Sequence, residues 1–143
     1  MIKKQFIAHF SLTKADKLKD KKFAILSGGE KQKIVIARAV AQTTPWMLLD
    51  EPIASLDIKN QIEIMQTLLE LNRQEGVSVL MVLHDINLAG IYCDRLIMLK
   101  DGQVIAAGNT NECLCEENLK KLYDISFFHM DTKKGQRYYY AEI

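Results

Sequence analysis

The sequence predicts an α/β protein with a parallel sheet. Two short apolar runs, WMLLD at 46–50 and VSVLMVL at 77–83, have the composition of buried strands. One helical pattern lies before the first run, and another lies between the two runs over 58–74. Strands that alternate with helices in this way are typical of a parallel sheet flanked by helices.

The N-terminal segment is the least regular part of the pattern. In QFIAHFSL, residues 5–12, apolar side chains alternate as in a strand, but Phe6, Ile7 and Phe10 also fit one face of a helix. The polar stretch 13–22 carries five lysines among acidic residues and is typical of a solvated face. Both a strand and a helix therefore remain open for residues 5–12.

A helix is expected in LSGGEKQKIVIARAVAQ, residues 26–42. Ser27 and Glu30 have the S-x-x-E spacing of a capping box, in which each side chain bonds the main-chain N–H of the other residue. Apolar residues continue the helical pattern, and it ends before Pro45. The helix between the two strands closes before Gly76, a residue type that is favoured just after a helix.

The C-terminal part combines short helices with hairpins. Asp85 can cap a helix over 86–92. The extended runs RLIMLK and QVIAAG flank Asp101-Gly102, which is a strong hairpin signal. A further helix is expected over 111–122. The runs FFHMD and RYYYAEI on either side of KKG predict a second hairpin.

Composition places the chain among soluble globular proteins. It has 143 residues, enough for one domain, of which 48% are hydrophobic and 26% charged. The net charge of +1 gives no general argument for a nucleic-acid partner. No apolar run has the length of a membrane span, and no signal peptide is visible. The three cysteines lack C-x-x-C spacing, which favours free thiols in a reducing, cytoplasmic environment over a zinc site.

Polar residues stand where the two apolar strands end. Asp50 and Glu51 follow the first strand, and His84 follows the second. In open α/β sheets, ligands bind at the carboxyl ends of the strands. The glycines after Ser27 leave the N–H groups of a helix N-terminus open to an anion. Each motif alone has an ordinary interpretation, as a helix cap, a turn or a hydrogen-bonded strand end. Their order and spacing favour a phosphate site.

In this order the motifs resemble those of the ATP-binding subunit of ABC transporters. LSGGE at 26–30 is similar to the signature motif, WMLLDE at 46–51 to Walker B with its catalytic acid, SLD at 55–57 to the D-loop, His84 to the switch histidine, and LIMLKDGQVIAAG at 96–108 to the segment that follows it. The resemblance covers about residues 12–125. It implies a partial P-loop NTPase (RecA-like) parallel sheet with flanking helices, followed by C-terminal β-hairpins.

One element of the family is missing from the sequence. None of the seven glycines belongs to a G-x-x-x-x-G-K-[ST] phosphate loop. The chain thus resembles the C-terminal half of the subunit, without the strand that leads into that loop. The resemblance implies three parts: the end of a helical subdomain with the signature helix (1–42), half of the catalytic core (43–110), and a C-terminal helix and hairpin (111–143).

The family's residue roles transfer by position. Asp50 is expected to hold Mg²⁺, and Glu51 to act as general base on the attacking water. The metal balances one carboxylate, so that its neighbour can lie beside it and still take a proton. His84 is expected to contact the γ-phosphate. The resemblance implies that the ATP held by a partner subunit is bound by Ser27, Gly28, Gly29 and Glu30, with Asp57 crossing the interface.

Two mild departures from the family pattern are present. Ile53 follows Asp-Glu-Pro where the family often has Thr, and Glu30 replaces the commoner Gln. Three functions remain open. The chain is a piece of an ABC transporter ATPase, or an inactive binding module that lends LSGGE to a complete partner, or an ABC ATPase of chromosome maintenance or DNA repair. The last carries long coiled coils, which this sequence lacks, and the first is favoured. Without a phosphate loop, the chain alone is expected to hydrolyse no ATP.

The segment LMVLHDINLAGIYCDRLIMLKDGQVIAAG, residues 80–108, looks most like the group of importers for iron chelates, haem or cobalamin. That group often has LHD-x-N and then Y-x-D here. The resemblance implies ATP and Mg²⁺ as cofactors. It implies a second ATP-binding subunit and transmembrane permease subunits as partners, with no nucleic acid, and a peripheral position on the inner face of the cell membrane.

Overall fold

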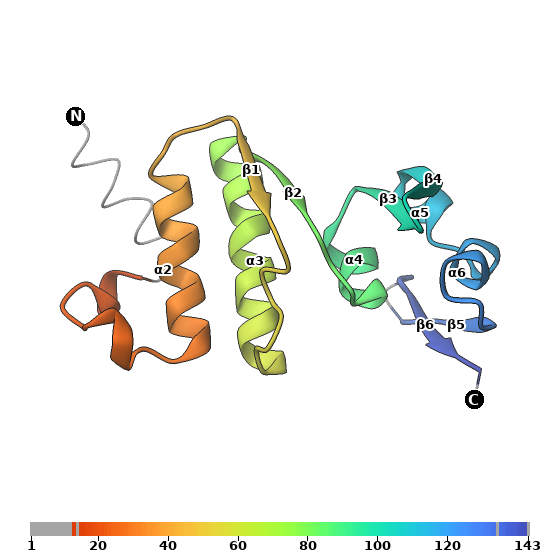
Figure 1. The fold of residues 1–143 in the computed structure, drawn as a ribbon, viewed down its shortest axis with the longest axis horizontal. Coiled ribbons are helices and arrows are strands. Elements are labelled where there is room, and N and C mark those ends of the chain that lie inside the picture. The colour runs from red at the N-terminus through yellow and green to blue at the C-terminus, as the bar shows by residue number, and fades with distance from the viewer. Residues whose placement is uncertain (1–12, 14, 134, 143) are drawn as a thin grey trace. The chain divides into compact units, whose positions relative to one another are not determined.

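The computed structural model describes residues 13, 15–133 and 135–142, and the chain divides into two compact units. The first unit is Met1–Leu83 and the second is His84–Ile143 (Figure 1). The segment 5–12, which fits both a strand and a helix, lies outside the described residues. The three-part division implied by the resemblance stays a prediction.

The first unit combines two long helices with a two-stranded parallel sheet (Figure 1). Its elements in chain order are η1 (Asp16–Leu18), η2 (Phe23–Ile25), α2 (Gly28–Val40), β1 (Trp46–Leu49), α3 (Ile58–Glu75) and β2 (Ser78–Met81). The expected alternation of helices with parallel strands is confirmed. So is the end of the second helix, since Gly76 caps α3 in the left-handed conformation at φ 67°.

Helices α2 and α3 pack side by side and form the centre of this unit (Figure 1). Ile36 on α2, and Ile64 and Leu68 on α3, are at most 2% exposed. An ion pair between Lys33 Nζ and Glu63 Oε2, 2.6 Å apart, joins the two helices beside this core. Fully burying an aliphatic side chain of this size stabilises a fold by about 1.5–3 kcal/mol, so the helix pair is a main source of the unit's stability.

The sheet departs from the expectation of two fully buried strands. Met47 is buried, but Trp46 and Leu48 on β1 are 61% and 74% exposed, and Leu80 on β2 is 49% exposed. The register pairs Leu48 with Leu80, so the two leucines lie opposite each other. Side chains of a strand alternate between the two faces of a sheet. The buried-strand prediction is therefore wrong for one face, because α3 packs against β2 but no described element of this unit covers the rest.

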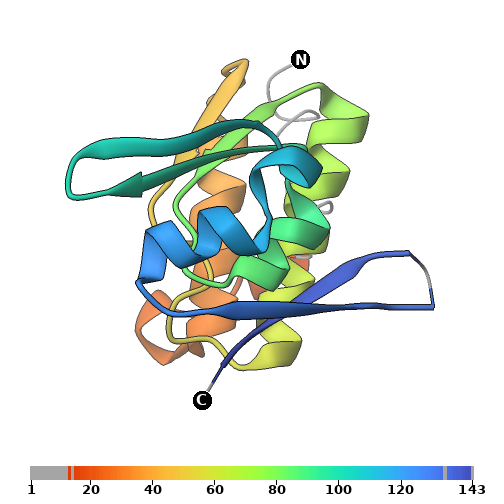
Figure 2. The same ribbon diagram turned by 90° about the vertical axis from the view of Figure 1, so that its right-hand side faces the viewer.

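The second unit joins two antiparallel hairpins through short helices. Its elements are α4 (Ile86–Tyr92), β3 (Arg95–Lys100), β4 (Gln103–Asn109), α5 (Thr110–Cys113), α6 (Glu116–Tyr123), β5 (Phe127–Asp131) and β6 (Arg137–Ala141). Figure 2 shows helix α6 between the hairpins β3–β4 and β5–β6. Both hairpins are confirmed, and the first turns through Asp101 and Gly102 at φ 50° and 75°.

The helix expected over 111–122 is interrupted. The chain instead forms α5 and α6, and the extended backbone of Cys115 separates them. Leu114 lies just before this break and Leu119 lies within α6, and both are buried in one apolar core with Met98, Phe127 and Tyr139. The extended backbone between the two helices thus lies between two leucines that share one core.

The exposed apolar residues of β2 predict self-association. Among the described residues β2 bonds only β1, so its other edge is open, and Leu80 and Val82 are about half exposed. An apolar strand with an open edge is a template for pairing. Leu80→Lys should lower the fraction of associated chain in sedimentation velocity at high concentration. As a control, Ile25→Lys adds the same charge at a 73% exposed site away from the sheet and should change association less. Equal effects of the two variants would contradict the role of the edge.

Candidate functional site

The signature turn is held by a complete capping box. Ser27 is the N-cap of α2, and its Oγ accepts a hydrogen bond from the N–H of Glu30 at 3.3 Å. In return, Glu30 Oε2 accepts from the N–H of Ser27 at 2.9 Å. A hydroxyl that accepts a bond through a lone pair still carries an O–H donor. Ser27 can therefore cap the helix and donate to an anion at the same time.

The charge at this turn is fixed by a lysine. Lys21 Nζ lies 2.8 Å from Glu30 Oε1. This hydrogen bond, followed by that from the N–H of Ser27, lowers the pKa of Glu30 to about 2. Glu30 is therefore ionised in the folded protein near neutral pH. Its charge lies at the positive end of the α2 dipole, where a carboxylate is stabilising.

The two signature glycines face different surroundings. A Cβ placed on Gly29 would lie 2.4 Å from Asn60 Oδ1, much closer than non-bonded atoms approach. A Cβ on Gly28 would meet only Leu56 Cδ2, at 3.4 Å. Gly29 is buried, whereas Gly28 is exposed. The absence of a side chain at Gly29 thus brings the start of α2 directly against the start of α3.

Asp57 is held at the start of α3. Its Oδ1 accepts from the N–H of Asn60 at 2.8 Å, and its Oδ2 accepts from the Asn60 side-chain amide at 2.9 Å. These bonds, the main-chain one first, lower the pKa of Asp57. Sequence reasoning missed Asn60, although the spacing Asp57-x-x-Asn60 is that of a helix N-cap and its third helical residue. Asn60 joins the D-loop to the signature turn, since it contacts both Asp57 and Gly29.

The two carboxylates stand at the end of β1. Asp50 and Glu51 are both exposed, and they are followed by Pro52 and Ile53, which are buried. Glu51 has φ 44°, in the left-handed region that a residue with a side chain rarely adopts. Such a conformation costs about 1–3 kcal/mol and persists only where surrounding structure imposes it. Ile53, two residues later, is only 6% exposed, so this turn is packed into the unit.

Carboxylate oxygens are hard donors and suit Mg²⁺, which proteins usually bind through one or two carboxylates together with substrate phosphates. Asp50 and Glu51 offer such donors at the strand end. Within the part of the chain that the structure describes, no three His, Cys, Asp or Glu residues gather as a metal site. The two carboxylates of Asp50 and Glu51 fit a metal that also takes oxygen atoms from a bound phosphate.

His84 is the first residue of the second unit and is exposed. It follows the end of β2, where the N–H of Val82 donates to the carbonyl of Leu49 at 3.0 Å. Directly after it, Asp85 caps α4, and Asp85 Oδ1 accepts from the N–H groups of Asn87 and Leu88 at 2.8 and 2.9 Å. The expected cap at Asp85 is confirmed, and it fixes the backbone next to His84.

Comparison with known proteins identifies the family. The family model of ABC transporters matches residues 3–54, which contain LSGGE, Asp50 and Glu51. The chain is 44% identical over 103 residues to an uncharacterised ABC transporter ATP-binding protein of Methanocaldococcus jannaschii, an alignment that covers 72% of this chain and 40% of the relative. The chain belongs to the ABC transporter ATP-binding family.

Two further relatives in this family have names that state an import function. The hemin import ATP-binding protein of Bordetella avium is 39% identical over 115 residues, covering 76% of this chain and 44% of the relative. The ferric enterobactin transport ATP-binding protein of Escherichia coli is 40% identical over 114 residues, covering 80% and 42%. The chain spans less than half the length of these ABC relatives.

Solved ABC structures confirm the fold. An ABC transporter assigned to the metal-chelate type, in an inward-facing conformation, matches 98% of this chain and 57% of that chain with a TM-score of 0.90 and 26% identity. A dimeric ATP-binding cassette in a post-hydrolysis state, bound to ADP and Pi, matches 73% of this chain and 45% of that chain with a TM-score of 0.62 and 37% identity. No helix in the described part of this ABC chain is long and apolar enough to cross a membrane.

The contact at Gly29 predicts unequal effects of two similar substitutions. Gly29→Ala places its Cβ against Asn60 and should lower the free energy of unfolding by about 1–3 kcal/mol, the usual range for overpacking. Gly28→Ala meets only the flexible end of Leu56 and should change it by less than about 1 kcal/mol. Urea denaturation of both variants measures the difference. If both were equally stable, the close approach of the two helices would be wrong.

The lowered pKa of Glu30 predicts an acid-dependent loss of stability. Because the folded-state pKa of about 2 lies below the ordinary value of 4.5, the ionised carboxylate stabilises the fold. This contribution is complete above about pH 4.5 and is lost as the pH falls through about 2. Glu30→Gln keeps an oxygen that accepts from Ser27 but removes the charge. Its free energy of unfolding should therefore fall less steeply than the parent's between these pH values, and parallel curves would count against the assignment.

Proposed function

We propose that this chain supplies the signature, Walker B, D-loop and switch residues of the ATP-hydrolysing subunit of an ABC importer. The observation that carries the proposal is the packing of the signature turn against the D-loop through Gly29 and Asn60. Two helix N-termini meet there, and both can face a phosphate with N–H groups. The family match and the import names of the relatives support the same assignment.

The proposed roles follow from the chemistry of each group. Ser27 donates its O–H, and Gly28 and Gly29 donate N–H groups, to the γ-phosphate of an ATP held by a second subunit. Glu30 keeps the turn in place through the capping box, and Asp57 orders the segment that faces that subunit. This division explains why the signature needs a serine and small residues at its start.

For its own nucleotide, the chain would use Asp50 and Glu51, which follow β1, and His84, which lies three residues after the end of β2. Asp50 binds Mg²⁺, which supplies positive charge to the phosphates when bound. Glu51 takes a proton from the attacking water, and His84 contacts the γ-phosphate and orients that water. The left-handed backbone at Glu51 supports a functional role, because strained residues cluster at active sites.

The import substrate and partners are inferred from the relatives. Names for hemin and ferric enterobactin import, and a solved transporter of the metal-chelate type, favour an importer of iron siderophore, haem or cobalamin. The dimeric cassette favours a second ATP-binding subunit as partner. The permease would hold both on the inner face of the cell membrane, and no nucleic acid is involved. The neighbouring genes test this assignment: a permease gene beside this one would support it, and the lack of one would count against it.

We propose one alternative function. The chain would be a module that donates LSGGE to a complete partner, since the capped signature turn is complete within these residues. The two functions differ in the need for Glu51. A donated signature works without the base on its own strand, whereas a hydrolysing subunit requires it.

The first test concerns the chain alone, which should show no steady ATPase activity. Charge-assisted hydrogen bonds to phosphate are worth about 1.5–3 kcal/mol each. Lacking three of them costs at least about 4 kcal/mol, or roughly a thousandfold in affinity. Phosphate release at millimolar Mg-ATP measures the activity. Turnover that disappears in Glu51→Gln would contradict this expectation.

The second test restores the phosphate loop. Joined to the N-terminal half of a relative that carries the loop, the chain should hydrolyse ATP, and Glu51→Gln should abolish turnover while ATP is still bound. The substitution removes the proton acceptor but leaves the phosphate contacts. Glu75→Gln, at the end of α3, makes the same chemical change away from the strand end and serves as the matched control. Turnover by Glu51→Gln near the parent rate would exclude Glu51 as the base.

A further inference from the structure

Asn87 joins helix α4 to the C-terminal hairpin. Its Nδ2 donates to the carbonyl of Tyr139 at 3.0 Å, and its Oδ1 accepts from the N–H of Tyr139 at 2.7 Å. The two residues are 52 positions apart in the chain and lie in the same unit. This pair of bonds, called the Asn87 clamp below, gives a structural meaning to the Asn of LHD-x-N.

The clamp satisfies an edge of the hairpin. Tyr139 lies opposite His129 in the antiparallel pair β5–β6. Since both main-chain groups of Tyr139 bond to Asn87, they point away from β5. A carboxamide offers one donor and one acceptor, as a peptide group of a neighbouring strand would. Asn87 therefore bonds the outer edge of β6 as a residue of a neighbouring strand would. Neither Asp nor Leu can provide both bonds.

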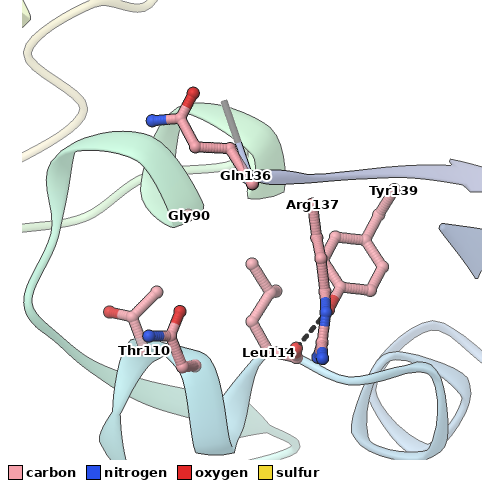
Figure 3. A pocket seen from close by; sticks show the side chains of 8 residues that line it. Gly90, Thr110, Leu114, Gln136, Arg137 and Tyr139 are labelled. Carbon is pink, nitrogen blue, oxygen red and sulfur yellow. Dashed lines mark hydrogen bonds between the residues drawn. The ribbon is translucent and has the colours of Figure 1, made fainter. Parts of the chain in front are cut away.

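Tyr139 is also held on its other side. Its hydroxyl donates to the carbonyl of Leu114, and the residue is only 3% exposed within the apolar core of the unit (Figure 3). A cavity of about 460 Å³, lined by Gly90, Gln136 and Arg137 among others, lies between the later part of α4 and the hairpin (Figure 3). The two bonds of Asn87, in the first turn of α4, are a direct connection between this helix and β6.

That first turn is continuous with His84. Asp85 bonds the N–H groups of Asn87 and Leu88, so residues 85–88 form one bonded turn, and His84 directly precedes it. A displacement of Asn87 would therefore reach the backbone of His84 through this turn. Both polar atoms of the Asn87 side chain are bonded to Tyr139, so Asn87 would act through His84 and not by touching a nucleotide itself.

We propose that Asn87 is a positioning residue that couples the C-terminal hairpin β5–β6 to His84. The proposal rests on the proposed function only in the role given to His84. It assigns the hairpin a part in hydrolysis: when the hairpin holds Tyr139 in place, the Asn87 clamp holds His84 at the position from which it contacts the γ-phosphate. A partner that moves the hairpin would change the rate of hydrolysis through the same two bonds.

The first arm of the test follows His84 directly in the full chain. Asn87→Leu has nearly the same shape but loses both bonds, and Asn87→Asp keeps the acceptor and loses the donor. Tyr139→Phe, the control, removes the bond to Leu114 and leaves the clamp. Asn87→Leu should lower the hydrogen-exchange protection of the Tyr139 amide at least about tenfold and shift the NMR signals of the His84 ring. His84→Gln assigns those signals. Tyr139→Phe removes only the hydroxyl bond to Leu114, so it should lower the stability of the unit but leave the main chain of Tyr139 clamped and the His84 signals unshifted.

The second arm measures ATP turnover by the chain joined to a loop-bearing N-terminal half. Asn87→Leu should lower kcat at least about fivefold with KM for ATP within about twofold, Asn87→Asp should lie between, and Tyr139→Phe should stay near the parent. Equal effects of Asn87→Leu and Tyr139→Phe on His84 signals and on kcat would overturn the proposal, since the clamp would then be only structural. If the unsubstituted chain, joined to the loop-bearing half, showed no turnover that depends on Glu51, the proposed function would be refuted. The His84 signals would still show whether the Asn87 clamp positions His84.

Discussion

The close approach of α2 and α3 at Gly29 is the contact on which the first unit depends. A Cβ at Gly29 would lie 2.4 Å from the Asn60 side chain, so any larger residue would force Asn60 to shift where the two helix starts meet. The positive ends of two helix dipoles repel each other, and each end here carries a carboxylate, Glu30 on α2 and Asp57 before α3. Both carboxylates have lowered pKa values and thus stay ionised near neutral pH. N–H groups at helix starts are also the donors that phosphate sites commonly use.

The strand end beside these helices combines stability with strain. Pro52 and Ile53 are buried and hold the turn after β1, while Glu51 adopts a left-handed backbone that an ordinary residue avoids. Packing of Ile53 and the helix core offsets this local cost. A sequence that used Gly at the position of Glu51 would relieve the strain but lose the carboxylate. The chain therefore keeps a carboxylate at this point at the cost of local strain.

The second unit shows how one short motif serves two purposes. In LHDIN, Asp85 caps helix α4 and Asn87 bonds both main-chain groups of Tyr139. Tyr139 in turn lies in the core formed by both hairpins and α6. The backbone next to His84 is thus supported by a residue near the C-terminus, and the hairpin is part of the same bonded network as the motif.

The sequence alone determined the features that depend on neighbouring residues. The capping box of Ser27 and Glu30, the caps at Asp85 and Gly76, the Asp101-Gly102 turn and the parallel pair of strands follow from local chemistry and apolar period, and all are present in the structure. The candidate site residues were likewise read from motif order. Only the tertiary structure revealed Asn60 against Gly29, the Asn87 clamp, the break between α5 and α6, and the exposed face of the sheet. These depend on contacts between residues far apart in sequence or on which faces other elements cover, and no local pattern encodes them.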